Sequence, residues 1–103
     1  MIIGLIGLGE MGSEIGRYLV MNDLEVISVY EGRSEISKKR ASKYKIRDAG
    51  SIEQFCKISD LVISIIPPDK ALETANLYTS YKNKDGQIYC DLNAITTITA
   101  KKI

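Results

Sequence analysis

Short apolar runs alternate along the chain with segments whose apolar residues recur at helical spacing. The runs predict strands over residues 2–6, 24–30, 61–66 and 87–92, with a brief edge strand within residues 45–48. The intervening segments predict helices over residues 10–21, 34–45, 51–57 and 69–81, and the opening of another over residues 96–103. This alternation predicts a doubly wound parallel sheet with right-handed crossovers and strand order 3-2-1-4-5. We expect one domain over residues 1–103, truncated after the fifth strand.

The local signals predict where helices begin and which faces they bury. Ser34, Ser51 and Asp69 are each expected to cap a helix N-terminus. The first helix carries apolar residues at helical spacing that we expect to face the sheet, namely Met11, Ile15, Tyr18, Leu19 and Met21.

The stretch between the first strand and the first helix is rich in glycine. Gly7, Gly9 and Gly12 fit the spacing G-x-G-x-x-G and lie between a buried strand and a helix, the context in which this motif is informative. Gly7 would allow the tight turn, Gly9 would let a pyrophosphate approach the backbone, and Gly12 would let the helix pack closely. The helix start would offer free N–H groups to the phosphates. The alternative is an ordinary glycine-rich turn.

Composition narrows the classes of partner and chemistry. Of 103 residues, 45% are hydrophobic and 26% charged, as in globular proteins, and the net charge of +1 gives no case for nucleic acid or an anionic membrane. No apolar run approaches the length of a membrane span, and the N-terminus lacks the features of a signal peptide.

The chain also lacks the residues that most metal sites and general bases use. There is no histidine, and Cys56 and Cys90 are far apart and outside any C-x-x-C pair, which argues against a zinc or transition-metal site. The cysteines are expected to be two small buried residues in a reducing cytoplasm, although a disulfide stays open.

The end of the second strand bears on the choice of cofactor. In a dinucleotide fold an acidic residue about 20 positions after the glycines binds the ribose hydroxyls, whereas an arginine there accommodates a 2′-phosphate. Glu31 offers the first device, and Arg33 with the hydroxyl of Ser34 offers the second. We expect NADP to be preferred, with NAD as the alternative because the Glu31 carboxylate would repel a 2′-phosphate.

Ligands of doubly wound sheets bind beyond the carboxyl ends of the strands. The strand over residues 61–66 ends in Pro67-Pro68, which cannot continue a hydrogen-bonded ladder, so Ile66, Pro67 and Pro68 are expected to contact the cofactor through their backbone.

These stretches together resemble a known family. Residues 4–12 (GLIGLGEMG) resemble the nucleotide-binding signature of the β-hydroxyacid dehydrogenases, which include 6-phosphogluconate and 3-hydroxyisobutyrate dehydrogenases. Residues 31–34 (EGRS), 64–68 (SIIPP) and 91–95 (DLNAI) resemble a branch of NAD(P)-binding proteins like 6-phosphogluconate dehydrogenase. The resemblance covers residues 1–103 and implies a Rossmann fold and hydride transfer with a small hydroxy acid.

The resemblance also implies roles for individual residues. The pyrophosphate loop would consist of Gly7, Leu8, Gly9, Glu10, Met11 and Gly12. Arg33 and Ser34 match residues that select NADP, Ile66 to Pro68 match a loop lining the cofactor ribose, and Asn93 matches a loop beside the nicotinamide that holds substrate.

Two departures from the family pattern affect the expected activity. Asn93-Ala94 replaces a serine-threonine pair of relatives such as hydroxyisobutyrate dehydrogenase, so the substrate class stays open. The family's catalytic lysine lies on a helix beyond residue 103, as does the helical domain that closes the site, and Lys101 and Lys102 come too early to match it. The chain therefore resembles the first part of a longer enzyme: a fragment, a truncated gene or one piece of a split protein.

Three functional hypotheses follow. The first is the cofactor-binding part of an NAD(P)-dependent oxidoreductase, inactive alone. The second is a non-catalytic dinucleotide-binding or sensing module that pairs with another chain. The third is a doubly wound domain that binds no dinucleotide, because this fold hosts many functions. An apolar patch where a missing half docks would promote self-association, or would bind a partner C-terminal chain.

Overall fold

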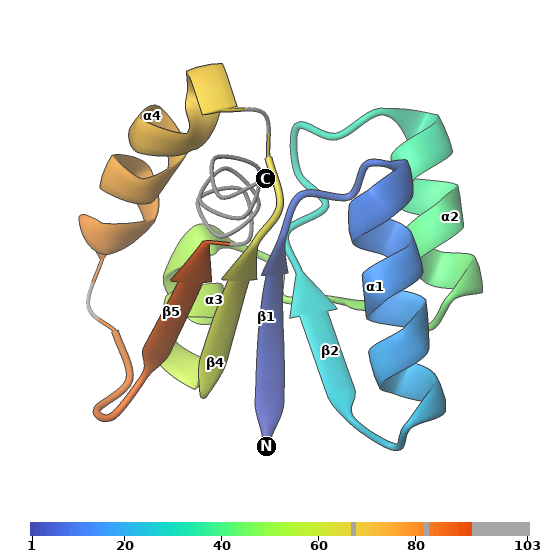
Figure 1. The fold of residues 1–103 in the computed structure, drawn as a ribbon, viewed down its shortest axis with the longest axis horizontal. Helices are drawn as coiled ribbons and strands as arrows, with labels where there is room; N and C mark the ends of the chain where they lie inside the picture. The colour runs from blue at the N-terminus through green and yellow to red at the C-terminus, as the bar shows by residue number, and fades with distance from the viewer. Residues whose placement is uncertain (67, 82, 92–103) are drawn as a thin grey trace, which may run out of the picture.

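A computed structural model of the chain describes residues 1–66, 68–81 and 83–91. Five parallel strands form one sheet in the order β3-β2-β1-β4-β5, with helices on both faces (Figure 1). The helices and strands, in chain order, are β1 (Ile2–Ile6), α1 (Glu10–Met21), β2 (Glu25–Ser28), α2 (Glu35–Lys43), β3 (Arg47–Asp48), α3 (Ile52–Ile58), β4 (Leu61–Ser64), α4 (Pro68–Thr79) and β5 (Ile88–Asp91). The Rossmann-type topology predicted from the sequence is confirmed.

Two of the three predicted helix N-caps are confirmed. The hydroxyls of Ser34 and Ser51 cap α2 and α3 by accepting hydrogen bonds from the N–H groups of Ser37 and Gln54. The prediction that Asp69 caps α4 is wrong, because the helix begins at Pro68. Proline suits the first helical turn, where its missing N–H needs no partner. The helix expected over residues 96–103 lies outside the described residues.

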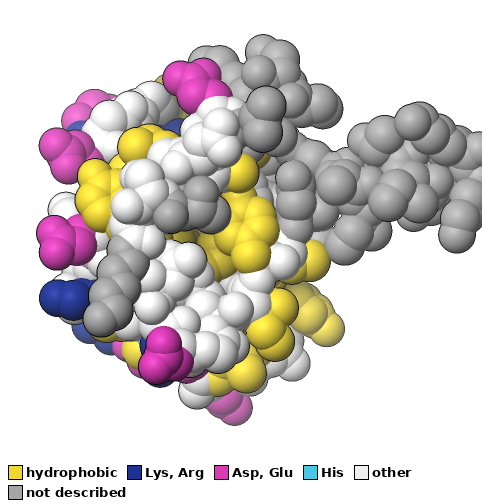
Figure 2. Space-filling model, turned by 90° about the vertical axis from the view of Figure 1, so that its left-hand side faces the viewer, with side chains coloured by type: hydrophobic (Ala, Val, Ile, Leu, Met, Phe, Trp, Pro, Cys, Tyr) yellow, Lys and Arg dark blue, Asp and Glu magenta, His cyan; other side chains and the backbone are white. Residues whose placement is uncertain are grey.

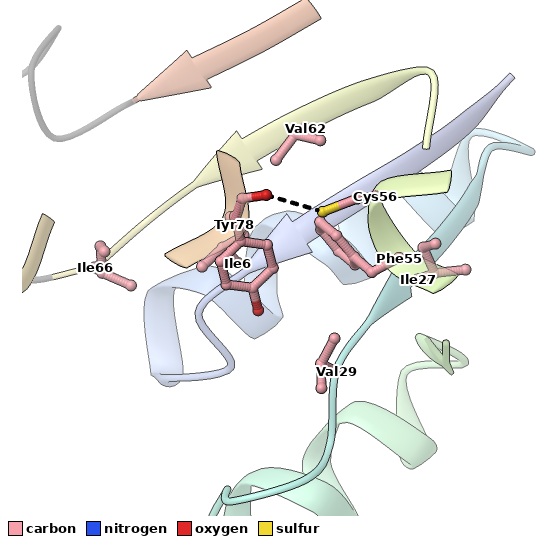
Figure 3. Close-up of a cluster of buried hydrophobic side chains, with 8 residues drawn as sticks. All are labelled: Ile6, Ile27, Val29, Phe55, Cys56, Val62, Ile66 and Tyr78. Carbon is pink, nitrogen blue, oxygen red and sulfur yellow. Dashed lines mark hydrogen bonds between the residues drawn. The ribbon is translucent and has the colours of Figure 1, made fainter. Parts of the chain in front are cut away.

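Two apolar clusters fill the space between the sheet and its helices. One faces α1 and α2 and includes Leu5, Val26 and Ile46. The other faces α3 and α4 and contains Ile6, Ile27, Val29, Phe55, Cys56, Val62, Ile66 and Tyr78 (Figure 3). Neighbouring residues of each strand point to opposite faces, so the continuous apolar runs supply both clusters.

The buried face of α1 differs from the prediction. Small residues make the face: Gly12, Ser13 and Gly16 are buried, while Met11, Tyr18 and Met21 are 67–70% exposed. A Cβ on Gly16 would lie 2.5 Å from Ile46 Cδ1. The helix therefore lies too close to the sheet for long side chains at these positions. Of the predicted stripe, Leu19 packs against the apolar cluster as expected, whereas the prediction is wrong for Met11, Tyr18 and Met21.

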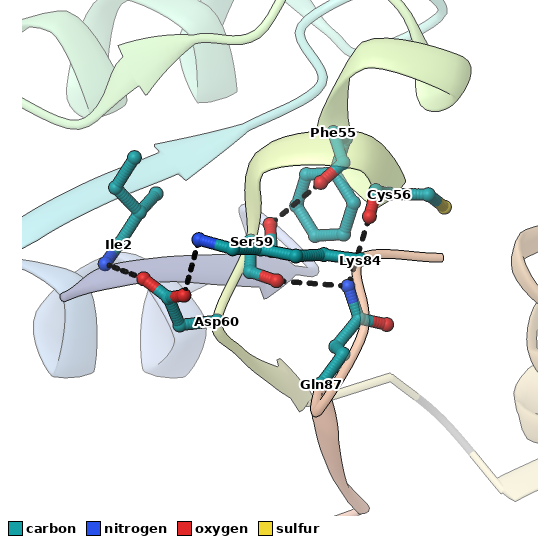
Figure 4. A network of polar contacts seen from close by, with 7 residues as sticks. All are labelled: Ile2, Phe55, Cys56, Ser59, Asp60, Lys84 and Gln87. Carbon is teal, nitrogen blue, oxygen red and sulfur yellow. Dashed lines mark hydrogen bonds and ion pairs between the residues drawn. The ribbon is translucent and has the colours of Figure 1, made fainter. Parts of the chain in front are cut away.

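A polar network joins the amino ends of three strands (Figure 4). Asp60 accepts a hydrogen bond from the N–H of Ile2 at 2.7 Å and pairs with the ammonium of Lys84 at 2.5 Å, while its own carbonyl accepts from Ile88 N–H. The amide of Gln87 donates to the carbonyls of Cys56 and Ser59, which end α3. These contacts fix the starts of β1, β4 and β5 relative to one another.

Two further findings bear on the sequence-based expectations. Cys56 and Cys90 are both free thiols, the first buried and the second half-buried. Within the described residues, no helix combines the length and apolar character that crossing a membrane requires.

Candidate functional site

The carboxyl ends of β1, β2 and β4 lie side by side at one edge of the sheet. The pairing of β1 with β4 continues past the strand ends, where Ile65 N–H donates to the Ile6 carbonyl at 2.8 Å. The chain leaves β1 toward α1 on one face and leaves β4 toward α4 on the other. This divergence is the topological switch point at which doubly wound sheets bind ligands.

Each glycine of the G-x-G-x-x-G motif meets a different environment. Gly7 has a φ of +107°, and a Cβ there would lie 2.1 Å from the carbonyl oxygen of Ile65. A Cβ on Gly12 would lie 2.2 Å from the carbonyl oxygen of Gly7. Both positions are therefore closed to side chains by the backbone itself. The close approach of Gly12 is to the turn at the end of β1.

Gly9 is the open position of the motif. No atom lies within 4 Å of the place where its Cβ would be, and its φ of −66° is available to any residue. Gly9 precedes the first turn of α1, whose N–H groups have no intrahelical partners. Free space, unpaired donors and the positive end of the helix dipole suit a pyrophosphate, so these residues fit a dinucleotide.

The other predicted residues of this loop divide between core and surface. Leu8 is 2% exposed and its carbonyl accepts a hydrogen bond from the buried Ser13 hydroxyl, so its side chain belongs to the core. Glu10 begins α1, and the side chain of Met11 is exposed beside it. The buried Ser13 hydroxyl, which the sequence analysis did not single out, ties the first turn of the helix to the loop.

A tight turn follows β2 and separates the two residues that bear on cofactor choice. Arg33 N–H donates to the carbonyl of Tyr30 at 3.0 Å, and Gly32 has a φ of +80° at the corner. Glu31 is exposed on this turn, whereas Arg33 is half-buried. Ser34 then caps α2, so its hydroxyl already serves the helix.

Tyr78 is a buried side chain of α4 that is only 5% exposed. Burial raises the pKa of Tyr78, and the positive charge of Arg33 partly offsets that rise. The phenol is therefore neutral at pH 7.

The end of β4 carries the diproline segment. Ile66 is 9% exposed and packs in the cluster against α3 and α4, and Pro68 begins α4. Pro67 and Asn93 lie outside the described residues. Ser64, the last residue of β4, is fully buried, and no partner for its hydroxyl is found in the described part of the chain.

The sequence analysis does not single out Tyr78 or Ser64 as residues of this site. It places Ser64 only in a strand and Tyr78 only in a helix. A signal was available for both, because a phenol or hydroxyl inside an apolar stretch needs a hydrogen-bond partner when it is buried.

A model of the NAD binding domain of 6-phosphogluconate dehydrogenase matches residues 2–103. The chain belongs to this family. Its five-stranded Rossmann sheet is thus that of an NAD-binding domain, as the sequence predicted.

Individual relatives agree with the family. The chain is 36% identical over its whole length to an uncharacterised 28.5 kDa protein of Methanothermus fervidus, encoded in the 5′ region of the 7S RNA. It is 28% identical, over 88% of its length and with a TM-score of 0.77, to a conserved protein of unknown function whose structure resembles 3-hydroxyacid dehydrogenases. The Mycobacterium tuberculosis 3-hydroxyisobutyrate dehydrogenase shares the fold at 19% identity, with 87% of this chain covered and a TM-score of 0.70.

The chain spans only part of these proteins. It covers 39% of the Methanothermus protein, 33% of the conserved protein and 30% of the Mycobacterium enzyme. Their remaining lengths have no counterpart among the 103 residues.

Proposed function

We propose that this NAD-binding domain is the cofactor-binding part of an oxidoreductase that acts on a small hydroxy acid, and that it prefers NADP to NAD. One observation supports the site above the others. The space where a Cβ on Gly9 would lie is open, whereas backbone atoms fill the corresponding space at Gly7 and Gly12. Gly9 is the N-cap of α1 and lies at the switch point of the sheet. When bound, the nicotinamide would supply hydride chemistry.

Each part of the site has a separate task in this proposal. The N–H groups of the first turn of α1 bind the pyrophosphate, and the backbone of residues 7–12 forms the loop around it. The family resemblance assigns the contact with the cofactor ribose to the backbone of Ile66, Pro67 and Pro68, and the contact with the nicotinamide and substrate to Asn93. The packing of Leu8 and Ile66 in the core supports contacts through their backbone rather than their side chains.

Arg33 is the main support for NADP. A guanidinium binds phosphate through several charge-assisted hydrogen bonds, and Arg33 is held half-buried near the end of β2. The turn at Gly32 leaves Glu31 exposed, which weakens the argument that its carboxylate repels a 2′-phosphate. Ser34 would contribute from the cap of α2.

Catalysis in this proposal needs residues beyond the chain. The family resemblance assigns the catalytic lysine and the closing helical domain to positions after residue 103, and the relatives are two to three times longer. The isolated chain is expected to bind cofactor without turnover. We also propose a reducing cytoplasm as its location, which its two free cysteines support.

The edge of the sheet at β5 supports a second contact. Figure 2 shows hydrophobic side chains gathered on the face that carries α4 and β5. Leu77, Tyr81, Ile88 and Tyr89 are 37–63% exposed there. In this proposal the surface mediates self-association or binds a partner C-terminal chain.

A titration with NADPH and NADH, followed by nicotinamide fluorescence, tests the proposal. Tighter binding of NADPH that is lost in Arg33→Ala would support the cofactor choice, whereas tighter binding of NADH that is lost in Glu31→Ala would reverse it. Lys43→Ala, at the far end of α2, is the control for a general loss of positive charge. Absence of binding to the folded chain would contradict the proposal.

A further inference from the structure

A basic cavity lies between the C-terminal ends of α1 and α2, which pack side by side (Figure 1). Its volume of about 280 Å³ is near the lower end of the range of small-molecule sites. The residues that line it are Arg17, Val20, Met21, Lys43, Tyr44 and Lys45. The cavity is at the opposite end of α1 from the glycine loop, about 18 Å away along the helix. It is therefore separate from the proposed cofactor site.

Two contacts hold Arg17 in place beside this cavity. Its guanidinium carbon lies 5.4 Å from the centre of the Tyr44 ring, and one guanidinium nitrogen is 3.6 Å from a carboxylate oxygen of Glu14. The Tyr44 phenol donates a hydrogen bond to the other Glu14 oxygen at 2.9 Å. The three side chains thus form one unit. The guanidinium is oriented before any ligand binds, which lowers the entropic cost of binding.

The positive charge of the cavity is only partly neutralised. Glu14 pairs with Arg17, whereas Lys43 and Lys45 form no ion pair with a carboxylate in the described part of the chain. Lys43 ends α2, where a cation also interacts favourably with the helix dipole, so its position alone does not indicate a ligand. The evidence for a ligand comes from Lys45.

Lys45 has a backbone conformation that suits glycine. Its φ is +63°, and it follows the C-cap of α2 in a Schellman motif, in which the N–H of Ile46 donates to the carbonyl of Ala41. Glycine is the usual residue at this position because a Cβ is unfavourable there. The chain instead carries a lysine whose side chain lines the cavity. Residues in such rare conformations cluster at functional sites, so the lysine indicates a binding role.

We propose that this cavity binds a small anion that carries an apolar group, such as an aryl phosphate or an aryl carboxylate. The guanidinium of Arg17 and the ammonium groups of Lys43 and Lys45 would bind the anionic group through charge-assisted hydrogen bonds. Val20 and Met21, whose side chain is 70% exposed, would contact the apolar group and be removed from water by it. The inference concerns a second site and does not rest on the proposed function.

The test follows the backbone amide NMR shifts of the 103-residue chain as it is titrated with three probes. Phenyl phosphate and benzoate are anions with an aromatic ring, and benzyl alcohol is a neutral molecule of similar size. We expect both anions to cause saturable shifts at residues 20–22 and 43–46, and benzyl alcohol to bind at least about tenfold more weakly than phenyl phosphate. The tighter of the two anions identifies the preferred anionic group.

Lys45→Gly separates binding from stability. The variant removes a cation and relieves the backbone, so it should weaken phenyl phosphate about three- to tenfold while raising the urea midpoint of unfolding. Asp23→Gly is the matched control, because Asp23 has a φ of +64° at the equivalent position after α1 and does not line the cavity. It should leave the affinity for phenyl phosphate within about twofold.

Two further variants test the charges. Arg17→Gln should also weaken phenyl phosphate about three- to tenfold. Lys39→Gln, at an exposed lysine of α2 that does not line the cavity, controls for the change in net charge and should leave the affinity within about twofold.

Three results would overturn the inference and leave the proposed function untouched. Shifts confined to residues 9–13 would place the anion at the glycine loop instead. Equal affinities for benzyl alcohol and phenyl phosphate would show an apolar surface without a site for an anion. Unchanged affinity for phenyl phosphate in both Lys45→Gly and Arg17→Gln would show that these cations do not bind it.

Discussion

The ring of Phe55 occupies the space that a side chain on Gly4 would need. A Cβ on Gly4 would lie 2.5 Å from Cζ of Phe55 and 2.3 Å from the hydroxyl oxygen of Ser59. Gly4 is in the middle of the central strand, and Phe55 is fully buried on α3. Glycine at this position lets the helix pack close to β1.

Gly4→Ala should therefore destabilise the domain by about 1–3 kcal/mol, the usual cost of overpacking a core. The free energy of unfolding in urea measures the effect. In a background that carries Phe55→Leu and Ser59→Ala, which removes both obstructing groups, the same change should cost less than about 1 kcal/mol. An equal cost in both backgrounds would show that the strand, and not the contact with α3, requires glycine.

Alanine substitutions at Gly9 and Gly12 should affect different properties: the first should weaken cofactor binding and the second should lower stability. Gly9→Ala should change stability by about 1 kcal/mol or less, because its backbone is unstrained and the position is open, yet weaken NADPH binding at least about tenfold. Gly12→Ala should cost about 1–3 kcal/mol, because the methyl group would overlap the Gly7 carbonyl. Urea unfolding and fluorescence titration separate the two effects. Full-strength binding by folded Gly9→Ala would argue against a pyrophosphate at this loop.

Asp60 should make the free energy of unfolding depend on pH in the acidic range. The hydrogen bond from Ile2 N–H and then the Lys84 ammonium lower the pKa of this carboxyl. A lowered pKa means that the stabilisation is full above the ordinary carboxyl value of about 3.9 and is lost as the pH falls through the lowered value. Asp60→Asn should reduce the urea midpoint at pH 7, and its difference from wild type should shrink in acid. Asp85→Asn, at an exposed carboxylate, is the control.

A constant difference between wild type and Asp60→Asn from pH 7 to pH 2 would contradict this linkage. It would assign the loss in the variant to packing or to the Ile2 hydrogen bond alone, without a contribution from titration.

The exposed apolar residues at β5 should drive association. Ile88→Lys places a charge on a side chain that is 63% exposed at the sheet edge, and should shift the chain toward monomer in sedimentation velocity while leaving its far-UV spectrum unchanged. Ile36→Lys, at a 70% exposed isoleucine on α2, is the matched control. A wild-type chain that stays monomeric at high concentration would contradict the prediction.

The sequence predicted the topology because its strongest signals are local. The apolar runs, the glycine spacing and the serine caps each determine their own segment, and their order along the chain then determines the sheet. Ser34 and Ser51 cap their helices as expected for this reason. The predicted strands over residues 24–30 and 61–66 extend beyond the observed ends of β2 and β4. Tyr30 and Ile66 are apolar because they pack against the core, although they lie in the loops that follow these strands.

The errors concern distances between elements, which the spacing of residues does not encode. The apolar spacing of Met11 and Tyr18 predicted burial, yet the close approach at Gly12 and Gly16 places small residues on that face. The edge-on contact between the rings of Phe55 and Tyr78 joins two different helices, and no local pattern could have predicted it.

The central place of β1 has a consequence for how the chain acquires its structure. Of the five strands, β1 is synthesised before the others and lies between β2 and β4, so its ladder on one side stays open until residues 61–64 leave the ribosome. Asp60, whose carboxylate accepts a hydrogen bond from the N–H of Ile2, is synthesised equally late. We therefore expect nascent chains shorter than about this length to remain unfolded and exposed to chaperones, and the domain to form only after its fourth strand emerges.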